Sequence, residues 1–145
     1  MPTETISVTK DKLKIEEGAY NAFITEVTGP VETRFNDTVK HKWIIHYKVL
    51  VNEESQELVQ YLNNVIHIGN GDSHSDSNLV VFLKQLGVFD EFNKNKEHLM
   101  NDNEFKDWLN SIIKEDKMRL QVLVKNSNKD TENEYSTVKE IIKKL

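Results

Sequence analysis

The chain has 145 residues, of which 37% are hydrophobic and 30% are charged, and this composition is typical of one globular domain. It contains no cysteine and no apolar run long enough to span a membrane, which excludes a disulfide framework, a cysteine zinc site and a membrane helix. Its net charge of −5 does not exclude nucleic-acid binding, because a local basic patch decides that interaction.

The first half of the chain predicts an N-terminal arm and two strands. Residues 1–17 are polar without periodicity and are predicted to be flexible. Residues 18–28 mix aromatic and β-branched side chains and predict a strand that ends at Gly29-Pro30. Residues 31–39, which are polar and contain Asn36-Asp37, are predicted to form a turn or loop. Residues 40–51 have a period-2 pattern, which predicts a strand whose inward residues are Trp43, Ile45, Tyr47, Val49 and Val51.

A short turn at 52–55, of none of the tight Asn-Gly types, leads to a third predicted strand from about Gln56 to Ile68, which can break at Asn63-Asn64. The Gly-, Asp- and Ser-rich residues 69–78 predict a loop. Residues 79–86 have apolar side chains at helical spacing. Ser77 or Asn78 is the expected N-terminal cap of that helix, and Gly87 its expected C-terminal stop.

The second half predicts one more helix and two more strands. Residues 89–103 are polar with scattered apolar residues, and residues 104–113 carry an apolar stripe that predicts a helix. Residues 117–125 alternate most clearly and predict a fourth strand. Its inward residues are Met118, Leu120, Val122 and Val124. After a polar turn, residues 134–142 predict a fifth strand.

This element order predicts a mainly β fold with a helical insert: a five-stranded OB-fold-like barrel with helices between strands 3 and 4. The single domain is expected to span 18–145, with the insert at about 77–116. Another small α+β fold with the same order of elements stays an alternative.

The chain resembles the phage-encoded single-stranded-DNA-binding proteins of OB fold. The resemblance rests on Gly18-x-Tyr20, on Trp43-x-x-x-Tyr47, on Leu83-x-x-Leu86-Gly87, and on the alternating strand from Met118 to Val124. It implies sequence-independent binding of single strands in phage-type replication or recombination, without catalysis or cofactor. It further implies a cytoplasmic location, in the host cell if phage-encoded, and a recombination or replication protein as a further partner.

Single-strand binding requires cations for the phosphates and aromatic side chains for the bases. Cations recur on the outward faces of the second and fourth predicted strands and in the loops beside them. The candidate nucleic-acid-binding residues are Arg34, Phe35, Lys40, Lys42, His46, Lys48, Lys117, Arg119, Lys125 and Lys129. The alternative is that these are ordinary solvated strand faces. Trp43, Tyr47 and Tyr20 are predicted to be core residues, whereas the faces of Tyr61 and Tyr135 stay open.

The sequence gives less support to a metal site or to an enzyme active site. Asp72, His74 and Asp76 have the ligand types of a metal site, but these residues are also the ordinary composition of flexible loops, so no metal is predicted. The sequence has no GxGxxG, Walker, HExxH or GxSxG motif, and we expect no enzyme activity.

The alternative function is an acidic protein-interaction module or inhibitor. Residues 53–116 carry 13 acidic and 5 basic residues, whereas residues 117–145 carry 4 acidic and 7 basic residues. The helical segment 89–116 would bind a basic partner through its acidic side chains and through Phe89, Phe92, Phe105 and Trp108. The alternative for these aromatics is packing of the helix onto the barrel.

Overall fold

The computed structural model describes residues 14–69, 76–115, 118–127 and 134–145. Five antiparallel strands form one open sheet in the order β3-β2-β1-β4-β5, and a helical segment lies between β3 and β4 in the chain. Within the described ranges, no helix is long and apolar enough to cross a membrane. The mainly β fold with a helical insert is therefore confirmed.

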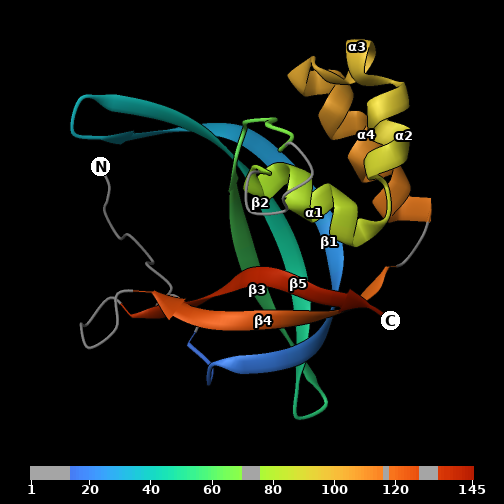
Figure 1. Cartoon of the computed structure of the whole chain (residues 1–145). Coiled ribbons are helices and arrows are strands. Elements are labelled where there is room, and N and C mark those ends of the chain that lie inside the picture. Colours follow the sequence, from blue (N-terminus) through green and yellow to red (C-terminus); the bar gives the residue numbers. More distant parts are fainter. Residues whose placement is uncertain (1–13, 70–75, 116–117, 128–133) are drawn as a thin grey trace, which may run out of the picture.

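Three long strands form the first part of the sheet (Figure 1). β1 (Gly18–Phe35) pairs with β2 (Thr38–Val51), and β2 pairs with β3 (Glu54–Asn63). Both connections are two-residue turns. In the second turn Asn52 and Glu53 both have positive φ, at 50° and 72°, so this turn is tighter than predicted.

The second part of the sheet consists of β4 (Arg119–Ser127) and β5 (Tyr135–Lys144), which pair with each other. β4 pairs with β1 only over Gly18–Phe23, so the rest of β1 extends beyond β4. As a result the hairpin of β1 and β2 projects away from the other strands (Figure 1).

The helical segment contains α1 (Asn78–Leu86), α2 (Phe89–Lys94), α3 (Lys96–Leu99) and α4 (Asp102–Glu115). α1 ends at Gly87, which is left-handed with φ 78°, as the sequence predicts. Ser77 is the N-cap position, but its hydroxyl accepts from the amide of His67 rather than capping the helix. Two of the four helices are short and fall in 89–103, where no helix was predicted.

The alternation of the strands predicts the core correctly. On β2, Trp43, Ile45, Tyr47 and Val49 are buried, and Val51 is half-buried. Met118, just before β4, and Leu120, Val122 and Val124 on β4 are buried in the same core. The predicted core role of Trp43 and Tyr47 is therefore confirmed, and neither ring is available to stack on a nucleotide base.

The prediction for residues 29–39 is confirmed for the turn at Asn36-Asp37 and wrong for the residues on either side of it. β1 does not end at Gly29-Pro30 but continues to Phe35, and the predicted loop is a β-hairpin with its turn at Asn36-Asp37. The register with β2 shifts between Thr28 and Val31, so Gly29 and Pro30 form a bulge within the strand. Pairing with β2 compensates for the two residues that locally disfavour a strand. The third strand ends at Asn63, at the break that the sequence indicated for Asn63-Asn64, and does not continue to Ile68.

Gly29 is held in a conformation that side chains disfavour. Its φ is 108°, and a Cβ atom there would lie 3.0 Å from the Lys42 carbonyl oxygen and 3.1 Å from the Val31 nitrogen. We expect Gly29→Ala to lower the free energy of unfolding by about 1–3 kcal/mol in urea denaturation. Gly87→Ala is the matched control, because Gly87 also has positive φ but its Cβ would meet nothing within 4 Å. An equal or smaller loss for Gly29→Ala would contradict the crowding argument.

A buried polar chain connects the two edge strands of the sheet. The Tyr47 hydroxyl donates to Gln60 Oε1 at 2.6 Å, and Gln60 Nε2 donates to the Lys139 carbonyl at 3.0 Å. Burial raises the pKa of the Tyr47 hydroxyl well above 10, which keeps it protonated as a donor. Through Gln60, β3 therefore contacts β5 although no ladder joins them among the described residues.

Side chains of α4 help to hold the helical segment on the sheet. The ring of Phe105 on α4 packs 5.2 Å from that of Trp43 on β2. The side chain of Asn110, also on α4, accepts from the Val27 amide at 2.8 Å and donates to the Val27 carbonyl at 2.9 Å. Asn110 thus supplies hydrogen-bond partners to the backbone of Val27, which lies beyond the part of β1 that pairs with β4.

The described end of the N-terminal segment is attached to the sheet. Ser136 Oγ lies 2.7 Å from the Ile15 amide and 3.1 Å from the Ile15 carbonyl, and Glu17 accepts from the Asn126 amide at 2.8 Å. Lys14 forms an ion pair with Glu134 at 3.0 Å. Residues 1–13, which make up most of the predicted arm, lie outside the described residues.

Candidate nucleic-acid interface

The outward face of β2 carries four of the basic residues that the sequence singles out. Lys40, Lys42, Ile44, His46 and Lys48 alternate with the buried residues of this strand and point away from the core. Lys42, His46 and Lys48 are half-buried, whereas Lys40 is exposed. The placement of these four basic residues on one face follows from the confirmed alternation of the strand.

A row of side chains crosses this face through Phe23. In the register of the sheet Phe23 on β1 lies opposite Lys48 on β2 and opposite Arg119 on β4. Directly opposite residues have Cβ atoms about 4.5–5.5 Å apart, so both cations flank the half-buried ring. Among the described residues, neither Lys48 nor Arg119 forms an ion pair. A partly exposed ring between two available cations can contact a base and its phosphates together.

A second aromatic ring lies on the same face. Tyr61 on β3 is opposite Ile44 on β2, and its side chain is 45% exposed. From strand geometry, the positions of Tyr61 and Phe23 are separated by about 16 Å across the face. The sequence left the face of Tyr61 open and did not single out Phe23. Phe23 shares its strand face with the polar residues Asn21 and Thr25, which are two positions away on either side and are exposed. This period of two is the sequence signal that Phe23 points outward.

The hairpin contributes a second group of cations. Arg34, Lys40 and Lys42 line a shallow hollow together with Thr33 and Thr38. Arg34 lies in the last part of β1 rather than in the predicted loop, and its Nε forms an ion pair with Glu32 at 3.0 Å. Phe35 is the last residue of β1, and its side chain lies outside the described part of the structure.

The remaining predicted residues are not part of these groups. His46 shares a hydrogen bond of 2.8 Å with the Thr28 hydroxyl, so its ring is held against β1. Lys125 lies next to the first residue of β1, because Gly18 pairs with Val124, and it is therefore at the opposite end of β1 from Arg34. Lys117 and Lys129 lie outside the described residues.

The face is more positive than the chain as a whole. Its cations are Lys40, Lys42, Lys48 and Arg119. The acidic residues that lie opposite basic residues of the face are Glu57, across from Lys48, and Glu26, across from His46. Both carboxylates are exposed to solvent. The local charge is thus opposite in sign to the net charge of −5, which is the condition for a phosphate-binding patch on an acidic protein.

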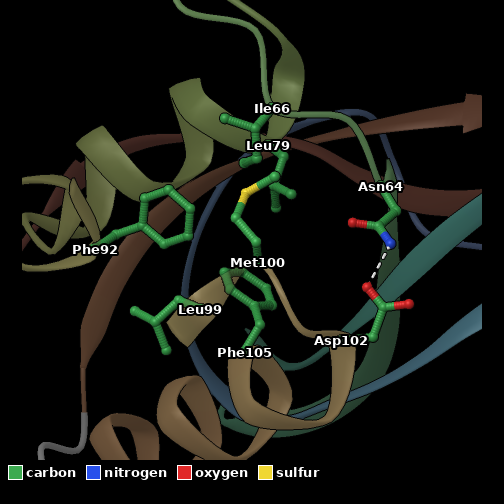
Figure 2. Close-up of a pocket in the computed structure, with 8 residues that line it drawn as sticks. All are labelled: Asn64, Ile66, Leu79, Phe92, Leu99, Met100, Asp102 and Phe105. Atoms are coloured by element: carbon green, nitrogen blue, oxygen red, sulfur yellow. Dashed lines mark hydrogen bonds between the residues drawn. The ribbon is translucent and has the colours of Figure 1, made fainter. Parts of the chain in front are cut away.

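A cavity of about 170 Å³ lies between the helical segment and the chain that leaves β3. Figure 2 shows its apolar wall, formed by Phe92, Leu99 and Phe105, and the hydrogen bond of 2.9 Å between Asn64 and Asp102 that borders it. Asn64 also accepts from the Trp43 indole at 3.0 Å. The polar groups at this border are engaged with each other, which indicates a structural role.

The aromatics of the helical segment mostly face the core. Phe92 and Phe105 are buried, and their rings meet edge to face at 5.8 Å. Trp108 and Phe89 are half-buried against Phe92. A partner of the helical segment would therefore find acidic side chains but not the two rings of Phe92 and Phe105.

Asp76 has a structural role. Its side chain is 3% exposed, its Oδ1 accepts from the Gly69 amide at 2.7 Å, and its Oδ2 pairs with Lys84 Nζ at 2.7 Å. Asp72 and His74, the other residues of the considered metal cluster, lie outside the described residues. Within the described ranges no three His, Asp or Glu side chains are placed to hold a metal ion.

The Asp76 contacts predict a loss of stability in acid. The hydrogen bond from Lys84, and after it the one from the Gly69 amide, lower the pKa of this carboxyl. Its contribution is therefore present above the unfolded-state pKa of about 4 and disappears as the pH falls through the lower folded-state pKa. We expect Asp76→Asn to flatten the acid side of the curve of unfolding free energy against pH. Asp107→Asn, an exposed position on α4, is the control, and an identical change in both variants would contradict the assignment.

Comparison with known proteins found no family model, curated protein or solved structure that matches this chain.

Proposed function

We propose that this protein binds single-stranded DNA without catalysis and with little sequence preference, along the outward face of β1, β2, β3 and β4. The observation that carries the proposal is the row Lys48–Phe23–Arg119, in which an aromatic ring is flanked by two cations that form no ion pair with any described residue. Stacking of a base on an aromatic ring contributes about 1–3 kcal/mol and does not depend on the identity of the base. Tyr61 supplies a second ring on the same face.

The arrangement favours a single strand over a duplex. In a duplex the bases are stacked on one another, so the rings of Phe23 and Tyr61 have no base face to contact. A single strand exposes both its bases and its phosphates, and Lys42 and Lys40 continue the positive charge from this face along the hairpin.

We further propose that the sheet curls into an OB-type barrel. The strand order places β3 and β5 at the two edges, and the Gln60 side chain connects them by its hydrogen bond to the Lys139 carbonyl. This is the neighbour relation that closes a five-stranded barrel of that type, in which an oligonucleotide lies across strands 2 and 3.

The test is a titration of the purified protein into labelled oligo-dT at low and moderate salt, followed by fluorescence anisotropy. Saturable binding that weakens steeply with salt is expected, because bound phosphates release counterions. A duplex of equal length is the control and should bind more weakly. Absence of binding at low salt, or equal affinity for the duplex, would refute the proposal and favour the acidic helical segment as a protein-binding surface.

A further inference from the structure

The outer half of β1 has one open edge. On the edge of β1 that faces away from β2, β4 pairs only with Gly18–Phe23. Beyond that pairing, the Asn110 side chain hydrogen-bonds to both the amide and the carbonyl of Val27. In the described part of the chain no strand pairs with residues 28–35 on that side, although β2 pairs with them on the other. An open edge of this kind presents backbone donors and acceptors that can pair with another strand.

The register identifies the backbone groups at this edge. Phe35 and Thr38 close a two-residue turn, so their N–H and C=O groups face each other across the hairpin. The groups of the alternate residues Glu32 and Arg34 therefore point to the open edge. The backbone of Pro30 also points to the open edge, but proline has no N–H to donate. A regular ladder at this edge is therefore limited to residues 31–35.

The charges at this edge are self-complementary, so that the edge of one copy matches the edge of a second copy. If two copies of the chain pair antiparallel about a two-fold axis through Thr33, Glu32 of each copy lies opposite Arg34 of the other. Both residues also carry the backbone groups that would form the ladder. Within one chain Glu32 and Arg34 form an ion pair whose side chains are 47% and 76% exposed. Exchanging this exposed ion pair for two ion pairs between chains costs little free energy.

We infer that this protein self-associates through the edge of β1 at residues 31–35, as a two-fold dimer whose hairpins form a continuous antiparallel sheet. A two-fold contact of this type is isologous, meaning that the same patch on each copy makes the interface. Val31, which is 37% exposed, lies opposite position 35 of the second copy and adds apolar contact. Because the contact covers only five residues on each copy, the dimer is weak and depends on protein concentration.

The test is sedimentation velocity of the full chain from about 10 µM to about 1 mM, a range that covers weak dimers. The average mass of the unaltered protein should rise from one chain toward two. Glu32→Arg places arginines opposite arginines and Arg34→Glu places glutamates opposite glutamates, so each variant alone should stay monomeric. The double variant Glu32→Arg/Arg34→Glu restores opposite charges and should dimerise again.

An equimolar mixture of the two single variants gives the sharpest outcome. One supplies two arginines and the other two glutamates, so the mixture should associate where neither component does. Glu97→Arg on α3 is the control for net charge and should associate like the unaltered protein. A monomeric unaltered protein at all concentrations, or a mixture that stays monomeric, would overturn the inference. The experiment contains no DNA, so its outcome does not depend on the proposed function.

Discussion

Replacing Lys48 and Arg119 together with alanine is expected to weaken binding of oligo-dT by about 10–100-fold at low salt. Each phosphate contact on a single strand contributes about 0.7 to the slope of log K against log salt. Loss of two contacts should therefore reduce that slope by about 1.4. Anisotropy titrations at four or more salt concentrations measure both quantities in one series.

The fold should survive this double substitution. Arg119 is exposed, Lys48 is half-buried, and neither forms an ion pair with another described residue. Alanine at both positions leaves the buried face of the strands unchanged. Circular dichroism and the urea midpoint should therefore match those of the unaltered protein, which separates a loss of contact from a loss of structure.

Lys94→Ala with Lys106→Ala is the matched control. These lysines lie on α2 and α4, and their removal changes the net charge by the same amount as removal of Lys48 and Arg119. We expect the control to retain nearly all of its affinity and its salt slope. An equal loss in both double variants would mean that the total charge, rather than the face around Phe23, determines binding.

The interior of the sheet was predictable because alternation depends only on neighbouring residues. Trp43 to Val49 and Met118 to Val124 are buried at every second position, as their patterns indicate. The continuation of β1 through Gly29-Pro30 was not predictable in this way. It depends on pairing of Val31 with Lys42 and of the following residues with the start of β2, and local signals do not reveal this long-range pairing.

The candidate site could be predicted only in part for the same reason. The sequence indicates that Lys48 and Arg119 point outward, but only the register shows that Phe23 lies between them. The face of Tyr61 stayed open because Gln60, a polar residue, is buried between Leu58 and Leu62 and hides the alternation of β3. Gln60 is inside because it bridges Tyr47 and the Lys139 carbonyl, a role that depends on two other strands.

Asn110 is a residue whose importance the sequence does not reveal, and its replacement should have the largest effect on stability. It is one polar residue among others in a predicted helix, yet it satisfies both backbone groups of Val27, whose own side chain is buried. Asn110→Ala would leave one donor and one acceptor without partners. Since each such group costs about 1–3 kcal/mol, the free energy of unfolding should fall by about 2–6 kcal/mol.

Two further variants separate this effect from a general loss of helix packing. Asn110→Asp keeps an oxygen for the Val27 amide but removes the donor to the Val27 carbonyl, so it should also destabilise the protein. Ser111→Ala, at the exposed neighbouring position, should change stability little. Urea denaturation gives the free energies, and hydrogen exchange of the Val27 amide reports the contact directly. Unchanged exchange at Val27 in Asn110→Ala would show that the hydrogen bonds of Asn110 do not hold α4 on β1.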